Sequence, residues 1–312
     1  MSSELTNVFA AKMLPQAELF SPGHRACQGC APALAMRFML KALGPDTIIC
    51  NSTGCIEIIS SSYPESAWGV PWIHVAFENS AAVASGVEAG LKAMMRKGRI
   101  PERKITVLAQ AGDGGSMDIG LQAISGALER GHDMIYMCYD NEAYMNTGIQ
   151  RSSGTPYGAA TTTSPAGKHS FGQSTWKKSF AEIAVAHHIP YVATASVSYP
   201  FDFMEKLKKA AAVKGPALIH VFAPCPTGWR CASNVAVRLG RLAVQTAAFP
   251  LYEVVDGRFR ITQNVPHLKP LKLYLQPQGR YRHLTDDQIE YLQAELRKRY
   301  AALVARAEAT QE

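Results

Sequence analysis

The residues with the clearest chemical pattern are a glycine-rich turn and an asparagine that follow two successive expected strands. The turn is Gly112-Asp113-Gly114-Gly115, and the asparagine is Asn141. Glycines let backbone N–H groups approach phosphate oxygens, and a helix that starts after the turn adds partial positive charge. Asp113 can give Mg²⁺ a carboxylate oxygen, Asn141 a side-chain oxygen and Ala143 a backbone carbonyl, while diphosphate and water complete the octahedron. The pattern therefore predicts a magnesium diphosphate site.

The spacing of the two elements makes this prediction specific. A lone Gly-Asp-Gly is common in turns, but here it is joined to Asn141 by a complete strand-helix-strand unit. Dinucleotide binding is the rival, yet Gly-x-Gly-x-x-Gly and the acidic residue at the ribose position are missing. The region resembles the diphosphate-binding domain of thiamine diphosphate enzymes.

The cysteines form a second group with possible metal chemistry. Cys27 and Cys30 precede an expected helix, whereas Cys55 and Cys225 each follow an expected strand. Four thiolates can hold a 4Fe–4S cluster or a zinc ion, and their spacing leaves both open. A disulfide framework is not expected, because seven is an odd number and no export signal is visible. Outside the ligand set, Cys50 and Cys138 are expected to be buried in strands, and Cys231 is expected to be a spare thiol.

Three motifs carry a more detailed resemblance. Residues 23–30 (GHRACQGC), residues 53–55 (TGC) and residues 224–229 (PCPTGW) look like the beta subunit of 2-oxoacid:ferredoxin oxidoreductases of the pyruvate type. In that family four cysteines ligate a 4Fe–4S cluster, and they match Cys27, Cys30, Cys55 and Cys225. The resemblance therefore favours the cluster over zinc.

The same resemblance implies roles for other residues. It places Thr53 and Gly54 against the cofactor and matches Asn146 to the asparagine that contacts the reacting substrate. The Asn146 amide could donate to an oxygen that becomes negative during the reaction. The chain departs from the family pattern at Ala31-Pro32, where many relatives carry a glycine and often a carboxylate. This departure leaves the electrostatics around the cofactor open.

A single diphosphate signature indicates half of an active site. Thiamine diphosphate needs a carboxylate against its pyrimidine ring, and Glu57 and Glu78 are local candidates. The resemblance instead assigns that glutamate to an alpha subunit. It also implies gamma and delta subunits, or a fusion, with ferredoxin-like clusters that pass electrons to ferredoxin. The implied reaction is oxidative decarboxylation of a 2-oxoacid with acyl transfer to coenzyme A.

The substrate and two other function classes stay open. Pyruvate is the first expectation, but relatives also act on 2-oxoglutarate, branched 2-oxoacids or oxalate; oxalate would give two CO₂ without coenzyme A. A second class is a non-redox thiamine-dependent decarboxylase with structural zinc. A third is a cluster-bearing assembly subunit without chemistry of its own, against which the intact Gly112-Asp113-Gly114 and Asn141 argue.

The elements expected around these residues alternate between strands and helices, which predicts a doubly wound parallel α/β sheet. Strands are expected at 47–50, 105–109, 134–139, 192–195 and 217–222, and helices at 33–43, 81–96, 119–130, 178–187 and 201–213. Residues 20–230 are predicted to form the cofactor domain after an N-terminal extension, 1–19. His74, between apolar neighbours, is expected to be a core histidine.

Residues 231–312 are expected to form a helix, an irregular extended arm and a terminal helix that contacts a partner subunit. Four prolines, at 250, 266, 270 and 277, indicate the arm. The terminal helix, 285–307, is amphipathic. Its apolar side is predicted to carry Ile289, Leu292, Leu296, Tyr300 and Leu303.

The composition excludes several classes. The 312 residues are 47% hydrophobic and 18% charged, which is typical of a soluble globular chain. Arginine or lysine interrupts every long apolar run, so neither a transmembrane helix nor a membrane partner is expected. The basic residues behind the net charge of +7 are spread along the chain, which argues against nucleic acid as a partner. A cytoplasmic location is expected.

Overall fold

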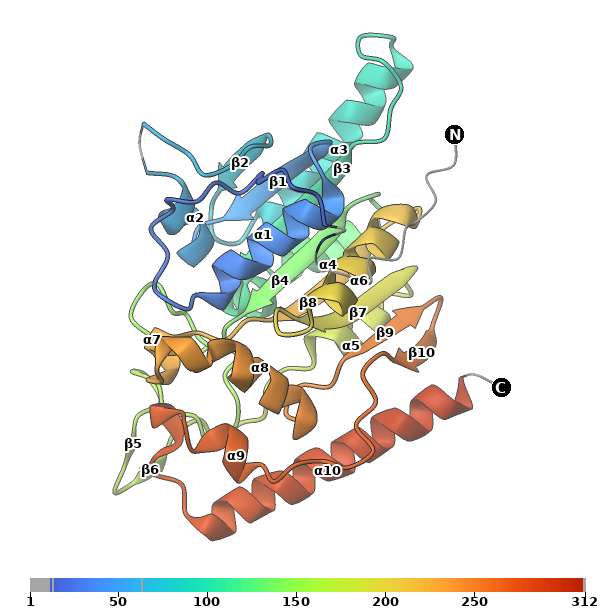
Figure 1. The fold of residues 1–312 in the computed structure, drawn as a ribbon. Helices are drawn as coiled ribbons and strands as arrows, with labels where there is room; N and C mark the ends of the chain where they lie inside the picture. Colours follow the sequence, from blue (N-terminus) through green and yellow to red (C-terminus); the bar gives the residue numbers. More distant parts are fainter. Residues whose placement is uncertain (1–11, 13, 63, 311–312) are drawn as a thin grey trace.

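The computed structural model describes residue 12 and residues 14–62 and 64–310; the expected N-terminal extension lies largely outside these. Within the described part, eight strands form one sheet in the order β10-β9-β7-β8-β4-β3-β1-β2 (Figure 1). They are β1 (Thr47–Ser52), β2 (Trp72–Val75), β3 (Thr106–Gly112), β4 (Ile135–Asp140), β7 (Tyr191–Ser196), β8 (Ala217–Phe222), β9 (Tyr252–Val255) and β10 (Arg258–Ile261). All run parallel except β9 and β10. The predicted doubly wound α/β fold is confirmed.

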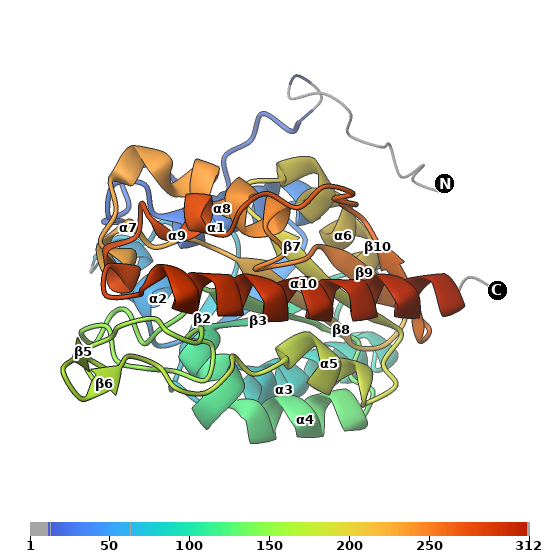
Figure 2. The same cartoon turned by 90° about the horizontal axis from the view of Figure 1, so that it is seen from below.

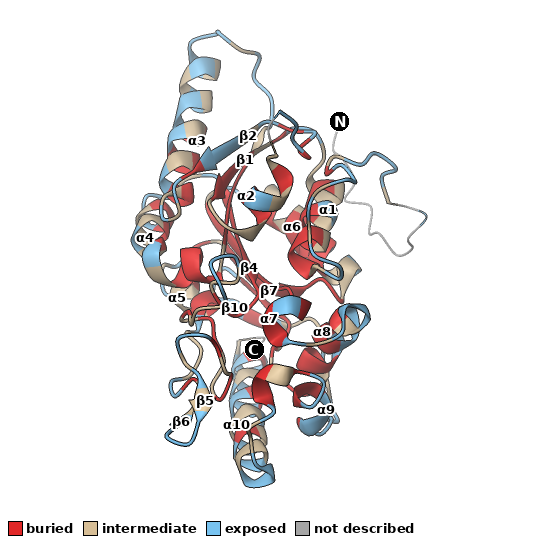
Figure 3. Cartoon of the chain, turned by 90° about the vertical axis from the view of Figure 1, so that its left-hand side faces the viewer, coloured by how far each residue is buried: buried red, intermediate tan, exposed pale blue. Residues whose placement is uncertain are grey.

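Helices cover both faces of this sheet (Figure 2). One face carries α1 (Ala31–Leu43) and α6 (Pro200–Ala212), and the other carries α3 (Ser80–Arg96), α4 (Leu121–Glu129) and α5 (Phe180–Val185). Side chains alternate along each strand, so β4 sends Met137 into the α1 face and Cys138 into the α3 face. Strands that are buried on both faces are mostly apolar, with a few buried polar residues such as Gln110 and His220, which is why the sequence showed them as nearly continuous runs. Figure 3 shows them buried at the centre of the molecule.

The C-terminal region is more regular than its prolines indicated. β9 pairs antiparallel with β7, and β10 pairs with β9, so this region extends the sheet. Short helix α9 (Lys272–Leu275) and helix α8 (Ala236–Gln245) pack into a third apolar cluster. The predicted terminal helix is α10 (Asp286–Ala309), and it packs against other elements of its own chain (Figure 2). Four of the apolar residues expected on one side of it pack into the apolar clusters, and the fifth, Tyr300, is also buried.

The carboxyl ends of four parallel strands place the predicted site residues at one rim. β1 leads to Thr53 and to α2 (Cys55–Ser60), β3 leads to Asp113, β4 leads to Asn141, and β8 leads to Cys225. From β1 the chain moves outward to β2 and then back past β1 to β3, so the strand order reverses here. Open α/β sheets bind ligands at such a switch point. No described helix is long and apolar enough to cross a membrane.

Candidate functional site

Three oxygen atoms meet where β3 and β4 end. The side-chain oxygen of Asn141 lies 2.9 Å from Oδ1 of Asp113 and 2.9 Å from the carbonyl oxygen of Ala143. Oxygens repel at this distance unless a hydrogen or a cation lies between them. Octahedral Mg²⁺ holds its ligands at 2.0–2.1 Å, which places neighbouring ligand oxygens about 2.9 Å apart. With the amide reversed, its N–H group would donate to Asp113 Oδ1 and to the Ala143 carbonyl at the same distances, so this spacing suits hydrogen bonds without a cation and ligation with one.

The Asp113 carboxyl group is fully buried, so its charged form is unfavourable without a nearby positive charge. Burial, and then the neighbouring Asp140, raise the pKa of Asp113 well above its usual range. The hydroxyl of Ser152 donates to one carboxyl oxygen, and the Asn141 N–H donates to the other at 3.3 Å. A bound divalent cation would stabilise the charged carboxylate in this place. Ser152 had no signal in the sequence.

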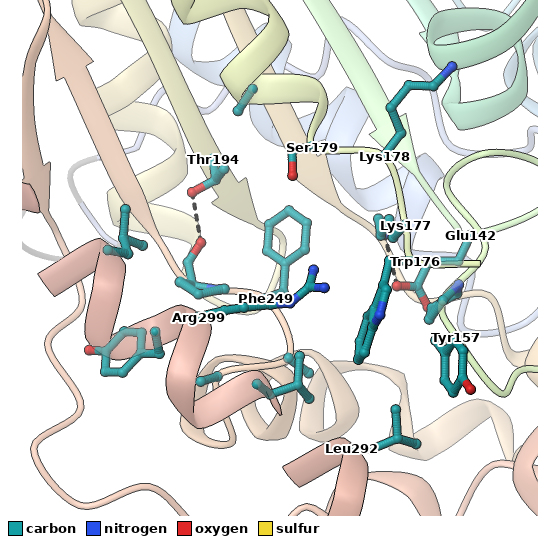
Figure 4. Close-up of a pocket in the computed structure, with 18 of the residues that line it drawn as sticks. Glu142, Tyr157, Trp176, Lys177, Lys178, Ser179, Thr194, Phe249, Leu292 and Arg299 are labelled. Carbon is teal, nitrogen blue, oxygen red and sulfur yellow. Dashed lines mark hydrogen bonds and ion pairs between the residues drawn. The ribbon is translucent and has the colours of Figure 1, made fainter. Parts of the chain in front are cut away.

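The residues on either side of Asn141 are anchored by a buried charge network. Lys177 Nζ lies 2.5 Å from Asp140 and 2.9 Å from Glu142, and His220 Nε2 lies 2.7 Å from Asp140. Burial favours the neutral form of Asp140, but Lys177 and His220 outweigh it and lower the pKa of Asp140. Lys177 and Glu142 also line a cavity of about 330 Å³ (Figure 4).

The C-terminal region completes this network. Arg280, 2% exposed, forms an ion pair with Glu142 at 2.5 Å, and its guanidinium lies 4.0 Å from the ring centroid of Trp229. The Trp229 indole N–H in turn donates to the carbonyl of Asn141 at 2.9 Å. Glu142 adopts a positive φ of 72°, a conformation that costs energy in a residue other than glycine. These contacts hold the loop in the shape that presents the three oxygens.

A cavity of about 240 Å³ opens beside the oxygens, and most of the predicted cofactor residues line it. These are Thr53, Gly54, Gly112, Gly114, Gly115, Asn141 and Ala143, together with Cys55 and the predicted catalytic residue Asn146. At Gly114 the Tyr144 ring leaves no space for a Cβ atom. Neither local candidate for the activating carboxylate, Glu57 or Glu78, is among the lining residues. The cavity therefore combines glycine backbone and small polar groups with the apolar surfaces of Phe77, Tyr144 and Met145.

The four predicted cysteine ligands gather at the same rim. Cys30 precedes the first residue of α1, Cys55 is the first residue of α2, and Cys225 precedes α7 (Pro226–Trp229). Burial raises the pKa of Cys30 and of Cys55 to about 12, and the nearby Cys27 and Cys225 contribute to the rise in both pKa values. Among the described residues, no three Cys, His, Asp or Glu side chains lie close enough together to hold one metal ion.

The other three cysteines have different surroundings. Cys50 and Cys138 are fully buried in the α3 face of the sheet. Cys231 packs against the third apolar cluster, as the predicted ligand Cys225 also does, and Arg280 counteracts the rise that burial causes in the pKa of each. Cys50 and Cys138 are therefore core residues as expected, while the role of Cys231 stays a prediction.

His74 is where the structure corrects the sequence. It was expected in the core, but it is exposed on β2, the edge strand of the sheet. Its Nε2 lies 2.8 Å from the hydroxyl of Thr53, a residue that lines the cavity. The apolar neighbours that suggested burial belong to a short strand in which Val75 alone is fully buried and Trp72 is partly buried.

Comparisons with known proteins agree with this geometry. Residues 52–221 match the family described as thiamine pyrophosphate enzyme, C-terminal TPP binding domain. The chain is 57% identical to pyruvate synthase subunit PorB of Methanocaldococcus jannaschii, over 89% of this chain and 94% of that protein. It is 52% identical to ketoisovalerate oxidoreductase subunit VorB of Pyrococcus abyssi, over 90% of each.

Among solved structures, a 2-oxoglutarate:ferredoxin oxidoreductase from Magnetococcus marinus is similar with a TM-score of 0.57. The match covers 94% of this chain and 93% of that one. At 18% sequence identity this likeness bears on the fold alone.

We expect Arg280→Met to destabilise the protein by about 3 kcal/mol, because Glu142 would lose one partner of a buried ion pair while keeping Lys177. Guanidinium unfolding, followed by tryptophan fluorescence, measures the change. Arg282→Met is the matched control, since Arg282 is exposed and its loss should change stability by less than about 0.5 kcal/mol. Equal effects of the two substitutions would show that Arg280 does not anchor the loop.

Proposed function

Because the chain belongs to the family of 2-oxoacid:ferredoxin oxidoreductase beta subunits, within the thiamine diphosphate enzymes, we propose that it forms the diphosphate half of a site for oxidative decarboxylation of a 2-oxoacid. The supporting observation is a shared cavity, in which Cys55 lies with Asn141 and Ala143. When bound, thiamine diphosphate supplies a carbanion for decarboxylation, and a 4Fe–4S cluster accepts single electrons. The family inferred from the sequence motifs is confirmed.

Mg²⁺ is the ion that suits the three oxygens beside this cavity. Asp113, Asn141 and Ala143 would supply three of its six ligands, and diphosphate oxygens and water the others. The set contains oxygen atoms only, which hard cations prefer, and a single carboxylate, which leaves charge for the diphosphate to balance. The glycine backbone of residues 112–115 lies where the diphosphate would then sit.

The thiolates would hold the cluster on the other side of the cavity. Cys27, Cys30, Cys55 and Cys225 come from three separate segments of the chain, and a four-iron cube is wide enough to join them. A cube is wider than one ion, so its ligands need not approach one another as closely as those of a single metal. Cys55 belongs to both sites, which would make the path for electrons short.

Other subunits would supply what this chain lacks. An alpha subunit would provide the pyrimidine-side domain and its activating glutamate, because neither Glu57 nor Glu78 lines the cavity. Gamma and delta subunits, or a fused equivalent, would carry further ferredoxin-like clusters toward ferredoxin. Asn146, exposed at the cavity, would face the substrate from this side.

Pyruvate is the substrate we expect, with coenzyme A as the acyl acceptor. Relatives named for pyruvate and for ketoisovalerate are both more than half identical to this chain, so identity alone does not separate the two acids. Turnover of the complete complex on pyruvate, 2-oxoglutarate, branched 2-oxoacids and oxalate, with and without coenzyme A, tests the choice. Pyruvate should give the highest kcat/KM and require coenzyme A. A higher value for a branched acid, or turnover of oxalate without coenzyme A, would contradict it.

Replacing the carboxylate ligand should remove thiamine diphosphate without removing iron. We expect Asp113→Ala to abolish thiamine retention, because the diphosphate loses its Mg²⁺, while iron content stays near that of the native complex. Thiamine and iron analysis of the anaerobically purified complex measures both. Asp46→Ala is the control, since Asp46 is exposed at the opposite end of β1. Full thiamine occupancy in Asp113→Ala would show that Asp113 is no ligand.

Replacing one cysteine ligand should remove the cluster. The native chain should contain about four irons, and Cys225→Ala should lose them together with the visible absorbance. Cys231→Ala, six residues away, should keep both. The reverse result would make Cys231 the fourth ligand, and zinc in place of iron in the native protein would favour the non-redox decarboxylase.

A further inference from the structure

Tyr139 carries a buried hydroxyl group that none of the metal or diphosphate contacts explains. The side chain is 1% exposed, and within the described part of the chain no group accepts its hydroxyl hydrogen, although the backbone N–H of Ile56 approaches the oxygen. A buried hydroxyl whose hydrogen has no acceptor costs free energy, and such groups are rare in folded proteins. Tyr139 also lines the cavity that contains Cys55 and Asn141. Its hydroxyl is therefore in position to contact a group bound at this rim.

Two glycines let the tyrosine reach across the sheet. Tyr139, on β4, is paired in register with Gly112 on β3, and a Cβ atom at Gly112 would lie 3.3 Å from the tyrosine ring. Farther along, a Cβ atom at Gly54 would lie 3.2 Å from the hydroxyl oxygen. The ring thus passes over the end of β3, and its hydroxyl ends beside the loop that follows β1. That loop places the hydroxyl next to Cys55.

The surroundings of the hydroxyl indicate its acceptor. Cys55 directly follows Gly54, where a Cβ atom would lie 3.2 Å from the hydroxyl oxygen, and Cys55 and Tyr139 line the same cavity. A cysteine that ligates iron is a thiolate, which can accept a hydrogen bond but cannot donate one. A phenol is a donor at neutral pH. The hydrogen bond between the two groups is therefore strongest when the cluster is in place, because a thiol sulfur accepts more weakly than a thiolate.

We propose that Tyr139 is a positioning residue for the cluster, and that its hydroxyl donates a hydrogen bond to Sγ of Cys55. This inference rests on the proposed function, since it requires iron at the four cysteines. Hydrogen bonds to ligand sulfur help to set the potential of an iron–sulfur cluster. They stabilise the reduced form, which carries more negative charge, so this bond raises the reduction potential. Electron transfer from the thiamine side of the cavity is favoured as a result.

The test is Tyr139→Phe, which removes only the hydroxyl group, in the complete complex. An EPR-monitored redox titration should show a more negative midpoint potential for the cluster whose signal Cys225→Ala abolishes. Iron content and the dissociation constant of thiamine diphosphate should stay within twofold of the native values. Tyr136→Phe is the matched control, because Tyr136 lies on the same strand but faces the opposite side, where its hydroxyl bonds to Ser116. Its potential should be unchanged.

Two results would overturn the inference while leaving the proposed function intact. An unchanged potential in Tyr139→Phe, with full iron content, would show that the hydroxyl makes no bond to the cluster ligand. An unchanged potential with weaker thiamine diphosphate binding would assign the hydroxyl to the diphosphate instead. Absence of iron from the native complex would instead overturn the proposed function, and iron analysis detects that before any potential is measured.

Discussion

The candidate site depends on three polar groups that crowd together at a spacing of 2.9 Å, which either a bound cation or hydrogen bonds from the Asn141 amide can stabilise. Asp113, Asn141 and Ala143 present them at the spacing of an octahedral edge, and the carboxylate among them is sealed from water. The surrounding contacts serve this arrangement: Ser152 binds the carboxylate, and Trp229 binds the Asn141 carbonyl. The charged residues on either side of Asn141 are neutralised by buried partners, so the loop keeps its shape before any ligand arrives. Because the loop is already ordered, cofactor binding does not have to supply the free energy that ordering it would cost.

The second constraint is that the residues proposed for the diphosphate and thiolate sites lie at one edge of the sheet. Parallel strands direct their carboxyl ends to the same side, so segments far apart in sequence meet there without a dedicated scaffold. Cys55 would belong to both proposed sites, and the Tyr139 ring extends from β4 toward the loop that precedes it. Decarboxylation and electron acceptance would thus take place on neighbouring groups at one cavity.

The sequence predicted most of the sheet and the composition of the site, but not how the site is supported. Strand 217–222 and the terminal helix agree because their patterns are uninterrupted. β9 and β10 were missed because charged residues break their alternation; Glu253, for example, is buried with Tyr191, Lys209 and Arg260 as its partners. Arg280 reaches Glu142 across 138 residues, and no local pattern reports such a pair. The glycine, asparagine and cysteine motifs were recognisable because their chemistry requires particular residue types at short spacings.

The most direct test of the shared rim is magnetic. Mn²⁺ replaces Mg²⁺ readily at oxygen sites and is paramagnetic, so it reports on nearby electron spins. With Mn²⁺ and thiamine diphosphate bound, the EPR signal of the reduced cluster that Cys225→Ala removes should relax faster than in the Mg²⁺ form, and Asp113→Ala should abolish the effect. Identical relaxation in the two metal forms would place the cation far from the cluster and contradict the account.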